Sequence, residues 1–286
     1  MYLILTCHVE VDRANQYGDA KRINLKAQSL SHVLYFLSLL SKYDIPITLS
    51  LTVGGQAGKN LLKLVSKEML SSNFELSIHF HFEEYDESKG KWIVSKITEE
   101  KIKNHCEAFY RILGFNPTSA VFGHWIINGE ILKWIRNLGL KVDGSYVPYR
   151  HNDRFVIKNP FKWEGILEVP VTSDGKYPLN PFTCSYHFDV VKHLIRRYYD
   201  KDVVLHLGFH SYDFFDFSSG KPQIRNVVMK ILERLLSCIK EYTLQCINLS
   251  DTLRYDFDPC VISQIPLRAT LSRYVTLFKE HHNKKV

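Results

Sequence analysis

Three residues near the start of this 286-residue chain have the spacing of a charged strand face. In the stretch LTCHVEVD, His8, Glu10 and Asp12 alternate with apolar residues. Side chains two residues apart in a β-strand point to the same side, and ionisable groups are costly to bury unless they are paired or bind a metal ion. The stretch is therefore either a solvated strand end or half of a metal site.

A second stretch, ELSIHFHFEE, repeats this spacing with His79, His81 and Glu83. Imidazole nitrogens and carboxylate oxygens together suit Zn²⁺ or a similar divalent ion, and a catalytic site needs only three protein ligands, which leaves one position for water. A histidine pair in one strand is a weak signal alone. Combined with the first stretch, it predicts a metal centre built from two strands.

A third stretch, LHLGFHSYDFFD, carries two more histidines. His206 falls inside a strand pattern, which indicates a core or wall residue, whereas His210 follows the strand. A histidine there suits a general acid, because the ordinary pKa of histidine lies near neutral pH, or it stabilises a turn, and Asp213 would orient it. In GHWIING, His124 and Trp125 are candidate substrate contacts, although Trp125 also fits a core position. Substrate-binding candidates in the first and third stretches are Asp12 and Asp213.

Strand-like and helix-like segments alternate along the chain. Apolar, β-branched runs predict strands at 2–7, 45–52, 74–80, 118–122, 140–142, 165–172, 203–208 and 244–249. Helical spacing predicts helices at 24–42, 59–70, 98–114, 128–138, 188–199 and 223–241. This alternation predicts an α/β fold with mainly parallel strands, namely a distorted (β/α)7-type barrel.

The predicted barrel also suggests where the remaining segments lie. Irregular loops are expected at 82–97, 143–164, 173–187 and 209–221, and in parallel folds such loops after the strands build the active site. We expect one barrel domain over residues 1–255. Residues 256–286 would be a C-terminal extension packed on that domain, with a helix at 267–279 and a basic tail.

Composition narrows the classes of function. A net charge of +7 suits solubility, or attraction to an acidic glycan, a pyrophosphate-linked substrate or an anionic membrane surface. We expect no nucleic-acid partner, because no basic stripe is interleaved with aromatic residues, and no membrane-spanning helix, because no run of eighteen apolar residues occurs. The six cysteines lack CxxC spacing, so we expect no disulfide framework and a cytoplasmic location. The absence of GxSxG and GxxxxGK[ST] argues against serine-hydrolase or nucleotide-driven chemistry.

The three stretches, in this order, resemble motifs of the polysaccharide deacetylase family of carbohydrate esterases. LTCHVEVD is similar to the family's first motif, an Asp pair at the end of strand one. ELSIHFHFEE is similar to the second motif, which carries a His pair, and VVLHLGFHSYDF is similar to the last motif, which carries the late His. The segments SAVFGHWIINGEILKWIRNLGLKVDGSYVP, GILEVPVT and QCINLSD are similar to the third motif, the fourth motif region and the last strand. The resemblance covers residues 2–253.

The resemblance implies a distorted β/α barrel that uses a metal ion to hydrolyse an N-acetyl, or sometimes O-acetyl, group on a sugar. By position, Glu10 and His79 correspond to metal ligands and His210 to the general acid. His8 stands where the family has its base Asp, so it is a neutral base or an additional ligand. Glu83 stands where the family has its second His, and His81 would substitute for that residue.

The third motif departs from the family as well, since its Arg falls on Val121 or is displaced. The absence of both the Asp and the Arg is consistent with a neutral base, because such a base needs no cationic partner. It is also consistent with a lineage that has changed or lost its chemistry. We predict a metal-dependent deacylase, chiefly an N-deacetylase with Zn²⁺, acting on an amino sugar of a cell-surface polysaccharide or its lipid- or nucleotide-linked precursor. The alternatives are an inactive glycan-binding protein on the same fold and a sugar deformylase.

Overall fold

The computed structural model describes residues 1–10, 25–68, 74–86, 91–153, 155–175, 177–183, 185–216 and 223–262. Within these ranges only the backbone is described for residues 25–31, 55–57, 68, 83–86, 91, 92 and 185. Asp12 and the helix expected at 267–279 lie outside the described residues. No helix in the described ranges is long and apolar enough to cross a membrane.

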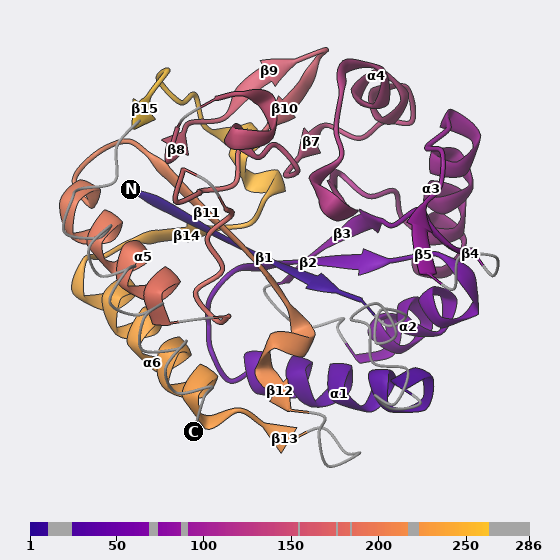
Figure 1. The fold of residues 1–286 in the computed structure, drawn as a ribbon, viewed down its shortest axis with the longest axis horizontal. Coiled ribbons are helices and arrows are strands. Elements are labelled where there is room, and N and C mark those ends of the chain that lie inside the picture. Colours follow the sequence, from indigo (N-terminus) through magenta and orange to yellow (C-terminus); the bar gives the residue numbers. More distant parts are fainter. Residues whose placement is uncertain are drawn as a thin grey trace.

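A curved sheet of nine strands occupies the centre of the molecule (Figure 1). In spatial order its main path is β11 (Val204–His210), β1 (Tyr2–Val9), β2 (Ile47–Thr52), β3 (Phe74–Phe80), β6 (Ser119–Phe122), β7 (Val142–Asp143), β10 (Ile166–Glu168) and β9 (Phe161–Trp163). The ninth strand, β14 (Gln245–Ile247), pairs with the start of β1. Every pairing except that of β10 with β9 is parallel. The prediction of a distorted, mainly parallel α/β barrel is confirmed.

Six α-helices of the described chain lie around the outside of this sheet (Figure 1). They are α1 (Leu25–Leu40), α2 (Gly55–Glu68), α3 (Glu99–Leu113), α4 (Gly129–Asn137), α5 (Ser185–Tyr198) and α6 (Asn226–Glu241). Helix α3 shows why the predicted bounds hold: the Thr98 hydroxyl accepts a hydrogen bond from the Lys101 amide, and Gly114 ends the helix at φ 81°. An apolar core fills the space between helices and sheet.

A second, smaller core lies on the inner side of the barrel. It consists of Ile4, Val121, Val142, Val169, Val204, Ile247 and Leu249. Fully buried His206 stands beside it in the barrel wall. Its Nδ1 donates to the Val169 carbonyl (3.0 Å), and its Nε2 accepts from the Thr6 hydroxyl (2.8 Å). The backbone of Thr172 also bonds to the carbonyl of His206 (2.9 Å), so the loop after β10 partly closes the barrel against β11. His206 is thus the wall residue that its strand pattern predicted.

Three carboxylates lie at two places in the sheet, Glu75 alone and Asp143 with Glu168. At the start of β3, Glu75 accepts hydrogen bonds from Thr48 (2.9 Å) and Ser119 (2.5 Å) side chains and from the Ser250 amide (3.0 Å). It therefore links β2, β3, β6 and the 3₁₀ turn η5 (Ser250–Arg254). Elsewhere, Asp143 and Glu168 face each other as register partners on β7 and β10.

The Asp143–Glu168 pair is completely buried. Burial raises the pKa of Asp143 to about 7, and burial followed by the charge of Asp143 raises the pKa of Glu168 well above its ordinary value. The Ser145 amide and hydroxyl both donate to Asp143 (2.7 and 2.8 Å). Burial of the two carboxyl groups is therefore favourable only while at least one of them is protonated.

Several segments differ from the predicted pattern. The loop expected at 82–97 contains an antiparallel hairpin, in which the short strand β4 (Glu83–Asp86) pairs with β5 (Lys91–Val94). Strands β1 and β11 extend to Val9 and His210, two residues beyond the predicted ends, because residues 8 and 210 are register partners. Residues 256–262 contain β15 (Val261–Ile262), which pairs with β8 (Ile157–Lys158).

Candidate functional site

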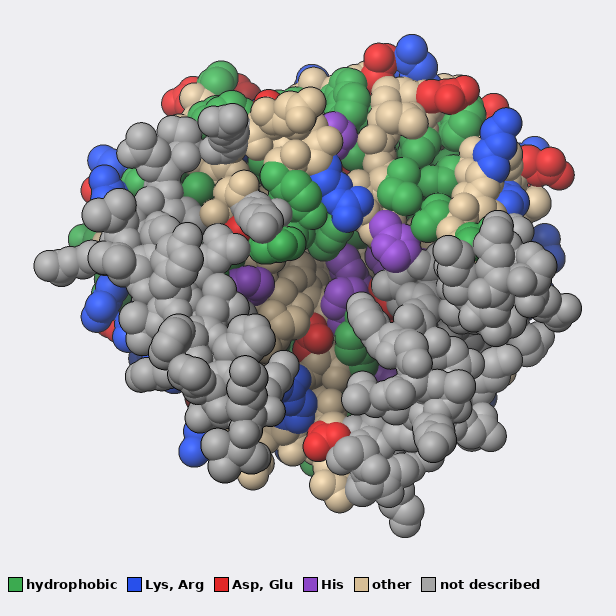
Figure 2. Space-filling model, viewed as in Figure 1, with side chains coloured by type: hydrophobic (Ala, Val, Ile, Leu, Met, Phe, Trp, Pro, Cys, Tyr) green, Lys and Arg blue, Asp and Glu red, His purple; other side chains and the backbone are tan. Residues whose placement is uncertain are grey.

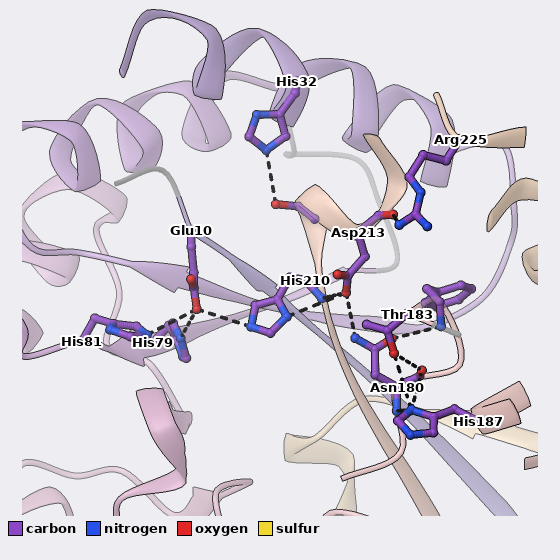
Figure 3. A network of polar contacts seen from close by, with 12 residues as sticks. Glu10, His32, His79, His81, Asn180, Thr183, His187, His210, Asp213 and Arg225 are labelled. Atoms are coloured by element: carbon purple, nitrogen blue, oxygen red, sulfur yellow. Dashed lines mark hydrogen bonds and ion pairs between the residues drawn. The ribbon is translucent and has the colours of Figure 1, made fainter. Parts of the chain in front are cut away.

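Four of the predicted residues meet at the carboxyl ends of the central strands (Figure 3). The Glu10 Oε1 atom lies 3.0 Å from His79 Nε2, 3.3 Å from His81 Nε2 and 3.6 Å from His210 Nε2. Glu10 follows β1, His79 and His81 come from the end of β3, and His210 ends β11. Figure 2 shows histidine side chains gathered in a hollow on this face of the molecule, with carboxylates beside them.

Strand register brings these residues together. In a parallel sheet the carboxyl ends of neighbouring strands lie at one edge, and here His8 is the partner of His210 and Thr52 that of His79. The 3₁₀ turn η2 (Gly123–Trp125) makes room for His81, because a Cβ at Gly123 would lie 2.3 Å from its Nε2. Any larger residue at that position would push the His81 ring aside.

The protonation of His79 is set by a backbone carbonyl. Its Nδ1 lies 3.0 Å from the oxygen of Val121, which can only accept a hydrogen bond, so Nδ1 carries the proton. Burial lowers the pKa of fully buried His79 to about 4, despite the opposing effect of Glu10, so the ring is neutral near pH 7. The lone pair of His79 Nε2 therefore points toward Glu10.

Glu10 is ionised in this position. Burial raises its pKa, but the hydrogen bonds of His79 and His81 and the nearby His210 outweigh that effect and place the pKa well below its ordinary value. Nε2 of His79 and Oε1 of Glu10 thus lie 3.0 Å apart. Because neutral His79 offers only a lone pair at Nε2, either a proton shared with Glu10 or a bound metal ion must lie between the two atoms.

The donor set fits such a cation. Zinc bonds to nitrogen and oxygen of about 2.0–2.1 Å imply ligand atoms about 3.3 Å apart in a tetrahedron. The two separations of Glu10 Oε1 from the β3 histidines, 3.0 and 3.3 Å, match this edge. Glu10, His79 and His81 offer ligand atoms that all lie within 4.8 Å of one another, and so do His8, Glu10 and His210. The hydrogen bond from His79 to Val121 is the kind of outer contact that orients a metal-binding histidine.

His8 and His210 lie on the other side of Glu10. The ring of His8 stacks on His79 at 4.6 Å and meets the edge of His210 at 5.0 Å. Its Nε2 is buried without a hydrogen-bond partner among the described residues. Burial, followed by the neighbouring histidines, holds the pKa of His8 well below its ordinary value, so the His8 ring is neutral.

His210 is held by the turn that follows it. The Asp213 carboxylate accepts a hydrogen bond from the His210 amide (2.8 Å) and lies 3.7 Å from His210 Nδ1. Asn180 donates a further bond to the same oxygen (2.7 Å), and Tyr212 stacks on the His210 ring at 4.6 Å. Asp213 therefore positions the histidine, as the sequence suggested, whereas Asn180 and Tyr212 carried no spacing signal that would have identified them.

The candidate substrate contacts lie at the rim and floor. His124 is exposed, 5.6 Å from the His81 ring, and Trp125 is half-buried, 5.1 Å from the His8 ring and packed over Gly208. Both have left-handed backbone angles, φ 54° and 56°, which are costly outside glycine and cluster at functional sites. Trp125 packs against the inner core below the histidines, as the core interpretation predicted, and its contact with a substrate stays a prediction. The Glu83 side chain and Asp12 lie outside the described atoms.

The fold and site define a distorted β/α barrel with a carboxylate and four histidines at the ends of its strands. No family model matches the sequence, and no curated protein matches it. Among solved structures, a protein from Mycobacterium smegmatis provisionally named a polysaccharide deacetylase has a TM-score of 0.60 at 13% identity, covering 93% of this chain and 94% of its own.

Two enzymes that act on glucans share the fold. A GH57-type branching enzyme from Pyrococcus horikoshii has a TM-score of 0.58 at 9% identity, covering 93% of this chain and 72% of its own. A 4-alpha-glucanotransferase from Thermococcus litoralis has a TM-score of 0.53 at 13% identity, covering 98% of this chain and 45% of its own. The resemblance in fold to polysaccharide deacetylases is confirmed, and the same fold occurs with other carbohydrate chemistry.

Proposed function

We propose that this protein is a metal-dependent deacylase that hydrolyses the amide bond of an N-acylated amino sugar. The observation that carries the proposal is the convergence of Glu10, His79 and His81, with Glu10 Oε1 3.0 Å and 3.3 Å from the Nε2 atoms of the two histidines and all three ligand atoms within 4.8 Å of one another. The donor set of two imidazoles and one carboxylate suits Zn²⁺. The fold likeness to a polysaccharide deacetylase supports a sugar substrate.

Glu10, His79 and His81 would hold the ion, with Glu83 the alternative to His81 that the sequence left open. A zinc ion held there supplies a Lewis acid that polarises an acyl oxygen and acidifies water. Such a centre needs no nucleophilic side chain of the protein, because the attacking group is water.

Two histidines would then move the protons. His8, neutral and buried, takes the proton of the water that adds to the acyl carbon. His210 gives a proton to the sugar nitrogen as its bond to the acyl carbon breaks, so a free amine and a carboxylic acid leave. Asp213 holds the backbone and ring of His210 for this transfer.

The substrate would enter over the rim formed by the η2 turn. His124 is exposed there, and the Trp125 ring lies against His8, so both are placed to contact a sugar. Asp12 and Asp213 remain proposed substrate contacts. We propose an amino sugar of a cell-surface polysaccharide or of its lipid- or nucleotide-linked precursor. A cytoplasmic location, no nucleic-acid partner and contact with an anionic membrane surface remain predictions.

The first test measures metal content and acid release on the same preparations. Protein purified without chelator is expected to contain about one equivalent of zinc by mass spectrometry and to release acetate from an N-acetylated amino sugar. Glu10→Gln, which keeps the shape but removes the charge, is expected to lose the metal and to lower the rate at least about 100-fold. Wild-type protein without metal affinity in solution would refute the proposal.

A second candidate is a glycan-binding protein without hydrolytic activity. It is favoured by one observation, namely that His8 stands at the position of the family's base Asp. This candidate predicts sugar binding by calorimetry that survives His210→Ala, with no acid released. Release of acetate would exclude it, and release of formate in preference to acetate from matched formylated and acetylated sugars would identify the deformylase alternative.

A further inference from the structure

Glu10 belongs to two ligand groups, and the proposed zinc ion uses only one of them. His8, Glu10 and His210 offer ligand atoms within 4.8 Å of one another, as do Glu10, His79 and His81. We propose that the first of these groups is a second divalent-cation position, which shares the Glu10 carboxylate with the first position and inhibits the enzyme when filled.

The burial and orientation of these residues support a ligand role. His8 and Glu10 are each 3% exposed, and the Nε2 atom of His8 has no hydrogen-bond partner among the described residues. His210 turns Nε2 toward Glu10 (3.6 Å) and Nδ1 toward the Asp213 carboxylate (3.7 Å). A carboxylate behind the far nitrogen is the usual support of a metal-binding histidine.

The charges of the two positions set their order of filling. Ions that share one bridging carboxylate lie about 3.5–4 Å apart in two-metal sites, and their mutual repulsion weakens the second binding step. The first position has the shorter contacts, 3.0 and 3.3 Å against 3.6 Å, and so fills first. We expect the second dissociation constant to be at least about 100-fold weaker than the first.

Occupation of the second position removes the proposed acid and base. An ion bound by nitrogen atoms of His8 and His210 blocks the lone pair that His8 needs to accept a proton and the proton that His210 needs to donate. This inhibitory effect rests on the proposed function, whereas the binding itself does not. Excess metal would therefore suppress the reaction that a first equivalent enables.

The experiment counts ions on the full-length chain. Metal-free protein is titrated with Zn²⁺ by calorimetry, and bound zinc is measured after equilibrium dialysis at limiting and at excess free metal. Wild-type protein is expected to bind two ions in two separate steps. Repeating the titration with Mn²⁺ tests proximity, because two ions this close give a spin-coupled electron paramagnetic resonance spectrum.

Matched variants locate the second ion. His8→Phe keeps a ring against His79 and Trp125 but removes both nitrogens, so it is expected to bind one ion with the first affinity changed less than about threefold. His210→Asn removes the same step and serves if His8→Phe does not fold. His193→Ala on α5, which changes a histidine outside both groups, is expected to keep two ions.

The number of bound ions distinguishes failure of the second position from failure of the proposed function. A single ion in wild-type protein overturns the second position and leaves the proposed function intact. No bound ion overturns both proposals. Two ions that persist in both His8→Phe and His210→Asn place the second ion elsewhere and also overturn the inference. In the activity assay, the second binding step is expected to lower the rate at least about tenfold, a loss that the first step does not cause.

Discussion

At the scale of single residues, the site depends on groups that make no motif. The acceptor that fixes the tautomer of His79 is the backbone oxygen of Val121, a position where the resemblance implied an arginine. Any residue there offers the same carbonyl, so the sequence could not reveal it. Gly123 is similar, since its role is the absence of a side chain beside His81.

We expect Gly123→Ala to weaken metal binding while leaving the fold intact. The new Cβ would overlap the His81 ring at 2.3 Å, so the ring must turn away from Glu10. Loss of one of three ligands should lower zinc affinity by at least about 10–100-fold. Calorimetry measures the affinity, and circular dichroism of the metal-free protein checks the fold.

Gly129→Ala is the matched control. It adds the same methyl group at the start of α4, where the nearest atom is 3.3 Å away on the Glu164 side chain, which can move. Its zinc affinity should equal that of the wild type. Unchanged affinity in Gly123→Ala would remove His81 from the ligand set.

At the scale of elements, strand and helix positions were largely predictable because apolar periodicity and caps are local signals. The strand 74–80 and the ends of α3 at Thr98 and Gly114 match the structure. The carboxyl ends of β1 and β11 were predicted too early, because His8 and His210 are polar and only pairing across the sheet keeps them in strands. Pairing joins residues about 200 apart, which local patterns do not report.

Glu75 links four elements, and its removal should destabilise the sheet without affecting the metal site. Its carboxylate accepts three hydrogen bonds at the end of β3 opposite His79. A hydrogen bond to a charged group contributes about 1.5–3 kcal/mol, but Glu75 is only half-buried and water can satisfy part of the network in its absence, so we expect Glu75→Ala to lower the free energy of unfolding by roughly 2–4 kcal/mol. Urea unfolding measures this change.

The comparison is Glu107→Ala on the exposed face of α3, where the carboxylate forms an ion pair with Lys103 at 3.9 Å. Exposed pairs of this kind contribute little, so the change should stay within about 0.5 kcal/mol. Both variants should bind zinc like the wild type. A Glu75→Ala protein as stable as Glu107→Ala would show that the network is dispensable.

At the scale of the whole molecule, stability depends on pH through the buried Asp143–Glu168 pair. Both pKa values are raised on folding, so the stability they contribute is complete below their ordinary values of 3.8 and 4.5. It is lost as pH rises toward about 7, the folded pKa of Asp143. The positive charge of Lys158 partly offsets the increase in the pKa of Glu168. The Tyr146 hydroxyl also lies close enough to interact with the Glu168 carboxylate.

Asp143→Asn removes one of the two charges and keeps an oxygen for Ser145. We therefore expect the stability of the variant relative to wild type to be greater at pH 7.5 than at pH 5, by roughly 1–3 kcal/mol. Urea unfolding at the two pH values gives this difference. Asp189→Asn, at an exposed ion pair with Arg234, should show no such dependence, and equal behaviour of the two variants would contradict the assignment.

The order of strands also has a consequence for how the protein is made. Strand β1 is synthesised before all of its neighbours in the sheet, β2, β11 and β14, and the last two follow more than 200 residues later in the sequence. Translation at about 5–20 residues per second leaves this apolar strand without β11 and β14 for about ten seconds or more. Nascent chains of this protein should accordingly bind chaperones until residue 247 has been released, and His8 and Glu10 cannot meet His210 before then.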